Sequence, residues 1–162
     1  MNTTGVEADL ATRIAQTRQW FEDGSPEPIQ GMLVRGRKCL VFPDQFVDAP
    51  KRRSEKHGAR FRLEIETGKE TREALVEVRI MPECSPSMDG DGFANPPYVS
   101  IYAIDPDSYA GDEITHTEIG SPKNYADATL ALGISDWYAY WLKFAFAHKK
   151  VAKLFKNQHA NS

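Results

Sequence analysis

The stretch ARFRLEIETGKETREALVEVRI, residues 59–80, decides the fold class. Phe61, Leu63 and Ile65 alternate with charged residues, and the same alternation returns in ALVEVRI after the segment TGKET. Alternation with a period of two is typical of β-strands that bury one face and expose the other. A glycine between two such runs is typical of a turn. The stretch therefore predicts an antiparallel hairpin with one face in a core and the other in water.

Further strands are predicted on both sides of this hairpin. MLV and CLVF are short apolar runs separated by RGRK at residues 35–38, which indicates a tight hairpin with a basic tip. The alternative is one long strand with a bulge at Gly36. YVSIYAI, at 98–104, is apolar on both faces and therefore predicts an interior strand, and ITHTEI after it predicts a short one.

The strand region is preceded by a predicted helix. Thr4 and Glu7 have the spacing of a capping box, and apolar residues from Val6 to Phe21 recur on one helical face. Asp23-Gly24, followed by two prolines, ends the helix. The sequence therefore places one helix before all the strands.

The predicted C-terminal helix is rich in aromatic residues. In SDWYAYWLKFAFAHKKVAKLFKN, which starts at Ser135, the first turns are apolar on nearly all sides. Such a helix is normally buried between a sheet and another element. Ser135 is the predicted N-cap, and a shorter helix is predicted at 125–132 before a break at Gly133. The predicted apolar face consists of Trp137, Trp141, Phe144, Val151 and Phe155.

Together these elements predict one α+β domain over residues 1–162. It has an N-terminal helix, an antiparallel sheet of about four to six strands and an aromatic-rich C-terminal helix packed on that sheet. We expect flexible ends at about 1–4 and 157–162, and long loops at about 43–58 and 82–97.

The composition excludes several classes of protein. Hydrophobic residues make up 41% and aromatic residues 10% of the 162 residues, so the chain has enough apolar surface for a core. It has no apolar run of about eighteen residues and no secretory signal pattern, so we expect a cytoplasmic protein. Cys39 and Cys84 lack the spacing of a zinc site and are expected to be buried structural thiols.

The net charge of −3 conceals a strongly uneven distribution. Residues 31–62 contain nine basic and three acidic residues, whereas 81–122 contain eight acidic residues and no basic one. Residues 137–162 contain five lysines and no acid. The sequence therefore predicts separate basic and acidic surfaces.

The leading functional hypothesis is a small non-enzymatic binding or accessory protein that acts through its basic surface. Clustered cations suit the phosphates of a nucleic acid or the acidic surface of a protein, for instance one that handles nucleic acids. The sequence pI of about 5.8 counts against a dedicated nucleic-acid binder. The predicted contact residues are Arg35, Arg37, Lys38, Lys51, Arg52, Arg53, Lys56, Arg60, Lys149, Lys150 and Lys153.

A metal-dependent hydrolase or nuclease that uses the acidic loops of residues 89–116 is the alternative. Carboxylates that converge from several loops are suitable ligands for Mg²⁺ or Ca²⁺. Aspartate is also common in turns, however, because its side chain bonds the backbone two residues on. We expect no cofactor and no catalytic residue. The candidate metal ligands are Asp89, Asp91, Asp105 and Asp107.

Three other groups of residues are candidates for catalysis. Glu64, Glu66 and Lys69 resemble part of a nuclease site, but Lys69 falls in the turn instead of on the strand face. His116 is either a half-buried structural histidine or an acid–base group. Ser100 is expected to be a hydrogen-bonded strand residue instead of a nucleophile.

A structural or assembly role is the third hypothesis. One sheet face was not expected to cover both Tyr138/Tyr140 and Trp137/Trp141 of the C-terminal helix. The sequence therefore predicts that the N-terminal helix or a second subunit covers the other side, and a homodimer through the C-terminal helix is the favoured alternative.

Overall fold

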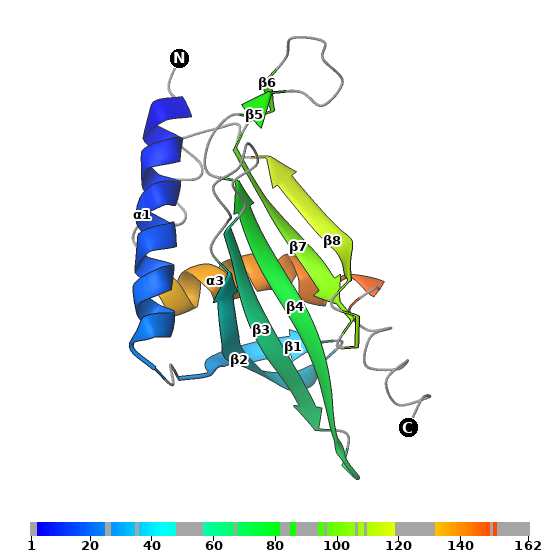
Figure 1. Ribbon diagram of the computed structural model, residues 1–162. Helices are drawn as coiled ribbons and strands as arrows, with labels where there is room; N and C mark the ends of the chain where they lie inside the picture. The colour runs from blue at the N-terminus through cyan, green and yellow to red at the C-terminus, as the bar shows by residue number, and fades with distance from the viewer. Residues whose placement is uncertain are drawn as a thin grey trace.

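The structure is a computed structural model of the chain (Figure 1). It describes residues 3–24, 27–34, 36–47, 57–66, 68–81, 85–86, 94–95, 97–105, 107–108, 110–118, 132–149 and 151. The elements are α1 (Thr3–Glu22), β1 (Ile29–Val34), β2 (Arg37–Val47), β3 (His57–Glu66), β4 (Thr71–Met81), β5 (Ser85–Pro86), β6 (Ala94–Asn95), β7 (Tyr98–Ile104), β8 (Gly111–Glu118) and α3 (Ile134–Phe146).

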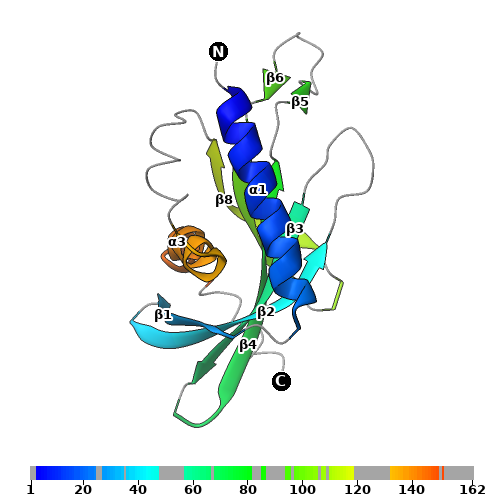
Figure 2. The same ribbon diagram turned by 90° about the vertical axis from the view of Figure 1, so that its left-hand side faces the viewer.

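Six strands form one antiparallel sheet in the order β1-β2-β3-β4-β7-β8. The sheet curves, and α3 lies within its concave side, as Figure 2 shows where the helix is seen end-on. The helix α1 packs next to α3 and against β2. The predicted α+β architecture, with an N-terminal helix, an antiparallel sheet and a C-terminal helix on the sheet, is confirmed.

The hairpin of residues 59–80 forms the centre of the sheet, as β3 and β4. Phe61 pairs with Val76 and Leu63 with Ala74, so their side chains share the concave face. All four are buried. The intervening charged residues therefore point to the opposite face, which we call the outer face. The period-two pattern of the sequence thus assigned each residue to the correct side.

An aromatic cluster joins α1, α3 and the sheet. The Trp20 ring stacks 6.0 Å from that of Tyr138, whose ring lies 5.0 Å from Phe61. The Tyr138 hydroxyl lies 3.0 Å from the Thr17 hydroxyl, so this buried polar group is satisfied by α1. Of the two covers that the sequence suggested for this side of the helix, the N-terminal helix and a second subunit, it is α1 of the same chain that covers Tyr138.

The C-terminal helix differs in detail from the prediction. Its N-cap is Gly133 without a side-chain capping bond, so Ser135 as the cap was wrong. The helix α3 ends at Phe146, and Lys149 and Val151 are again helical. Trp137 and Trp141 are buried as predicted, but Phe144 is 52% exposed. Phe155 lies outside the described residues. The helix predicted at 125–132 also lies outside them, except for Leu132.

The strand boundaries were partly predicted. The basic hairpin is confirmed, with Gly36 in the turn at a φ of 78°, and the alternative of one bulged strand was wrong. The strand β2 continues to Val47 although a loop was expected from Pro43. Its ladder shifts register between Pro43 and Gln45, which accommodates the missing N–H of the proline. In the second predicted loop, β5 and β6 form a short separate ladder.

Candidate binding surface

The outer face of the sheet is the candidate functional surface. Neither helix of the described part covers it, as Figure 1 shows from this side. It is nevertheless not a simple solvated face, because Glu77 and Ser100 are buried there. Buried polar groups need partners, so their bonds reveal how this surface is built.

An ionic network occupies the centre of the outer face. The Glu77 carboxylate, in β4, accepts a hydrogen bond from Arg60 Nη2 of β3 at 2.9 Å and another from Arg79 Nε. Glu77 is only 4% exposed. A Cβ at Gly58 would lie 3.0 Å from Glu77 Cδ, so the glycine gives the carboxylate the room to lie across β3. The sequence and the pairing of strands therefore combine to hold one buried carboxylate between two arginines.

The network extends towards β8 through aromatic residues. The Arg79 guanidinium lies 3.9 Å from the ring centroid of Tyr102, an arrangement suited to a cation–π interaction. The Tyr102 hydroxyl donates to Glu113 Oε2 at 3.1 Å. Burial, followed by this bond to Glu113, raises the pKa of Tyr102 above its usual value. Tyr102 is thus held protonated as a hydrogen-bond donor.

The His116 contacts do not form a catalytic triad. Ser100 Oγ lies 3.1 Å from His116 Nδ1, and Glu113 Oε2 lies 3.8 Å from the same nitrogen. A triad requires the nucleophile and the acid on opposite nitrogens of the ring. Ser100 is also fully buried, and the His116 ring lies 4.4 Å from the Tyr98 ring at an interplanar angle of 32°. The geometry favours the structural interpretation of both residues over the catalytic one.

The predicted basic contact residues do not form one patch in the described part of the chain. Arg37 and Lys38 are adjacent and exposed at the start of β2. Arg60 is bound to Glu77, and its side chain is 15% exposed. The β2–β3 register places Lys38 near Glu66, six residues from Arg60 on β3, which is about 20 Å along a strand.

The other basic clusters lie mainly outside the described residues, so only the residues next to them can be placed. Val47 and His57 flank the stretch 48–56 and lie at the opposite end of β2 from the hairpin, about 33 Å away at strand spacing. Lys149 is exposed beyond the end of α3. The predicted contact residues outside the described part are Arg35, Lys51, Arg52, Arg53, Lys56, Lys150 and Lys153.

Two of the four candidate metal ligands, Asp105 and Asp107, are described, and they form a hydrogen bond that is typical of a turn. Asp105 Oδ1 accepts a hydrogen bond from the backbone N–H of Asp107 at 2.8 Å, which is the local bond expected of aspartate in a turn. Asp89 and Asp91 lie outside the described residues. Within the described ranges, no group of three or more His, Cys, Asp or Glu residues is arranged to hold a metal.

The thiol of Cys39 is a core group. Its residue is fully buried in β2, as predicted, and burial raises the pKa of the thiol to about 12. Because the thiolate is the reactive form, this cysteine is not a nucleophile near neutral pH. Cys84 lies outside the described residues.

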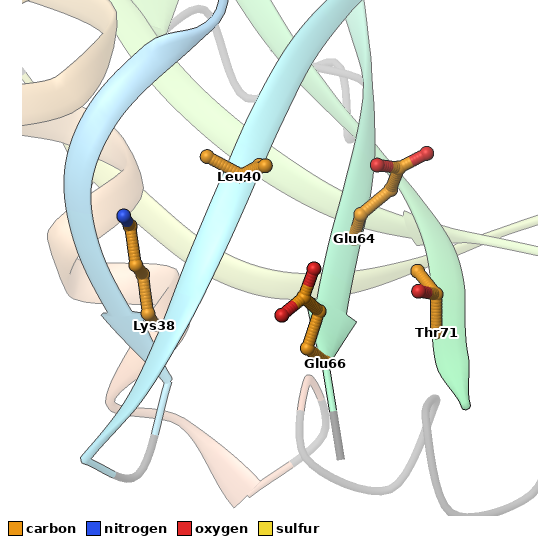
Figure 3. Close-up of a pocket in the computed structure, with 5 residues that line it drawn as sticks. All are labelled: Lys38, Leu40, Glu64, Glu66 and Thr71. Carbon is orange, nitrogen blue, oxygen red and sulfur yellow. The ribbon is translucent and has the colours of Figure 1, made fainter. Parts of the chain in front are cut away.

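A pocket of about 240 Å³ lies on the outer face near the basic hairpin (Figure 3). It is formed where β2, β3 and the start of β4 lie side by side. No motif in the sequence indicated it, because its walls come from three strands and only the register brings them together. We call it the hairpin pocket; it is lined by Lys38, Leu40, Glu64, Glu66 and Thr71.

Fold and surface together define a class of protein. In the described residues it is an α+β protein with α1 and α3 on the concave side of an antiparallel sheet and an ionic network on the outer face. No family model, curated protein or solved structure matches this chain. In the described part, no helix has the length and apolar character needed to cross a membrane.

Proposed function

We propose that this chain is a non-enzymatic, cytoplasmic binding protein that contacts an acidic surface of a partner protein through the β1–β2 hairpin. The observation that carries this proposal is the state of the hairpin cations. Arg37 and Lys38 are exposed, and within the described ranges neither has a carboxylate at ion-pair distance. Uncompensated exposed cations provide the complementary potential that steers association with an acidic partner.

The surroundings of the hairpin favour a protein over a nucleic acid. Leu33, which pairs with Lys38, is 60% exposed and offers apolar contact area. Glu64 and Glu66 lie beside Lys38 around the hairpin pocket. The Glu66 carboxylate opposes a row of phosphates, whereas protein interfaces combine apolar contacts with charges of both signs. The test must therefore distinguish a protein contact at the hairpin from binding of nucleic acid through the stretch 51–56.

A second proposal concerns association of two copies through α3. Phe144 is exposed, and its ring lies 5.6 Å from that of half-buried Tyr140. Two adjacent aromatic side chains on the outward side of a helix are suited to a subunit contact. This patch replaces Trp137, Tyr138 and Trp141 as the contact region, because those side chains are buried within the chain.

The test uses the whole protein as bait in native lysate of its source cells, with and without nuclease. We expect wild type to retain a partner after nuclease treatment and the double variant Leu33→Ser/Arg37→Ala to lose it. Asp44→Asn, an exposed change elsewhere on β2, is the matched control and should retain it. Association measured with the purified partner should slow as salt increases.

Two results would contradict the proposal. Release of the partner by nuclease, together with saturable binding of a labelled DNA oligonucleotide, would indicate a nucleic-acid binder. Equal capture by wild type and by the Leu33/Arg37 variant would show that the hairpin is not the contact region.

A further inference from the structure

The hairpin pocket holds two opposite charges that do not pair with each other. The register that pairs Cys39 with Ile65 places Lys38 of β2 near Glu66 of β3. Both side chains are exposed, yet within the described ranges neither forms an ion pair. Figure 3 shows the Lys38 ammonium and the Glu66 carboxylate on opposite sides of the β2 ribbon, with the Leu40 side chain further along the strand. An apolar side chain therefore lies beside a cation and an anion that do not pair.

The remaining charge at the pocket is already neutralised. The Glu64 carboxylate accepts a hydrogen bond from Arg62 Nη1, and Arg62 also contacts Glu73 at 3.2 Å. Arg62 in turn lies over the ring of Phe42, with 4.7 Å from the guanidinium carbon to the ring centroid. These contacts hold Glu64 to one side. The groups left for a ligand are Lys38, Glu66, the Leu40 side chain and the Thr71 hydroxyl.

We propose that the hairpin pocket binds a small zwitterion whose carboxylate and ammonium are separated by a short aliphatic chain. Lys38 receives the carboxylate, and Glu66, with Thr71 beside it, receives the ammonium. The methylene groups lie on Leu40, where they exclude water from an apolar surface. Charge-assisted bonds at both ends orient the ligand, as polar groups do in otherwise apolar sites.

The volume of the pocket sets the size of this ligand. A volume of about 240 Å³ lies below the usual range for sites of drug-sized ligands, so the ligand is small. A linear ω-amino acid with about eight non-hydrogen atoms, such as 5-aminopentanoate, is a suitable small probe. This inference goes beyond the proposed function, because it concerns a small ligand on the sheet and not the partner of the hairpin.

The test is a titration of the ¹⁵N-labelled whole protein with 5-aminopentanoate, followed by amide chemical shifts. We expect saturable shifts at the strand residues of the pocket. Pentanoate lacks the ammonium and pentylamine lacks the carboxylate, so each should bind about tenfold more weakly, the loss expected for one charge-assisted hydrogen bond. Glycine, being shorter, should also bind more weakly than 5-aminopentanoate.

Substitutions distinguish binding of the ligand in this pocket from non-specific attraction between charged groups. Lys38→Met and Glu66→Gln should each weaken 5-aminopentanoate about tenfold. Arg37→Gln changes the cation next to Lys38, on the opposite face of β2, and should leave the affinity unchanged. Asp44→Asn is the matched control for Glu66→Gln. These changes are at exposed positions, so the amide spectrum should show that each variant is folded.

The outcomes are decisive in either direction. The absence of saturable shifts with wild type overturns the proposal, as does equal binding of pentanoate or pentylamine. Loss of affinity in Arg37→Gln equal to that in Lys38→Met would show that the hairpin only attracts anions. That last result would leave the proposed protein contact intact, so the two proposals fail separately.

Discussion

Glu77 is the residue that most distinguishes the outer face from an ordinary solvated sheet. A carboxylate on an uncovered face is normally exposed, but this one is buried between Arg60 and Arg79. Gly58 makes room for it, and Gly111 does the same for Arg79, since a Cβ there would lie 3.1 Å from Arg79 Nη2. Two glycines and three charged residues from three strands thus form one unit.

The first prediction tests that unit at the residue scale. Glu77→Gln should lower the free energy of unfolding by roughly 3 kcal/mol, because it leaves two arginines without their carboxylate. This is the lower end of the usual range for a broken buried ion pair, since the Arg79 side chain is 28% exposed and reaches water. Urea unfolding followed by tryptophan fluorescence measures the change.

Glu73→Gln is the control for this prediction. Its carboxylate also contacts an arginine, Arg62, but it is exposed, so the change should cost less than about 1 kcal/mol. Equal effects of the two substitutions would show that burial does not strengthen the Glu77 contacts.

At the scale of elements, α3 determines how the concave face is filled. Trp137 and Tyr138 are consecutive, and both are fully buried, so the helix is enclosed on more than one side. The sheet provides one side and α1 another, through the contact between Trp20 and Tyr138. The apolar character of the first turns on nearly all sides is accounted for by this enclosure.

The second prediction separates the buried and outward sides of α3. Trp141→Ala should lower the free energy of unfolding by about 3–5 kcal/mol, because it leaves a cavity in the core. Phe144→Ala should cost less than about 1 kcal/mol, because the Phe144 ring is already half in water. Urea unfolding at submicromolar concentration measures both changes while limiting any contribution from association. Similar costs would mean that α3 does not pack as described.

At the scale of the whole molecule, the order of the strands places basic and acidic residues at opposite edges of the sheet. The basic hairpin belongs to the β1–β2 edge, whereas Asp112 and Glu113 lie on β8 at the other edge. Charged side chains at sheet edges oppose pairing with another sheet, and the register shift in β1 does the same. Association by extending the sheet is therefore disfavoured, which leaves α3 as the proposed contact between copies.

The third prediction concerns that contact. If two copies associate through Tyr140 and Phe144, light scattering at micromolar concentration should give twice the chain mass of 18.2 kDa. Tyr140→Ser/Phe144→Ser should then return the mass to that of one chain, because the exposed apolar area of the contact is removed. A wild-type mass of 18.2 kDa would contradict the proposal.

The sequence by itself determined the class of fold and the sides of the central strands. Period-two alternation in residues 59–80 depends only on the geometry of a strand, so Phe61, Leu63 and Ile65 were correctly assigned to the core. The N-terminal helix and the basic hairpin were also predicted, because helical periodicity and turn residues are local signals, although α1 already includes Thr3 and thus begins before the predicted cap Thr4. The sequence also indicated the exposed hairpin cations Arg37 and Lys38.

Only the tertiary structure decided which charged and aromatic groups meet. Arg60 had the same local pattern as the other cations, but the register of β3 and β4 places it against Glu77. Tyr138 is buried because α1, distant in sequence, covers it. The hairpin pocket similarly depends on the alignment of three strands. Such contacts depend on residues far apart in the chain, so no local periodicity, cap or turn signal encodes them.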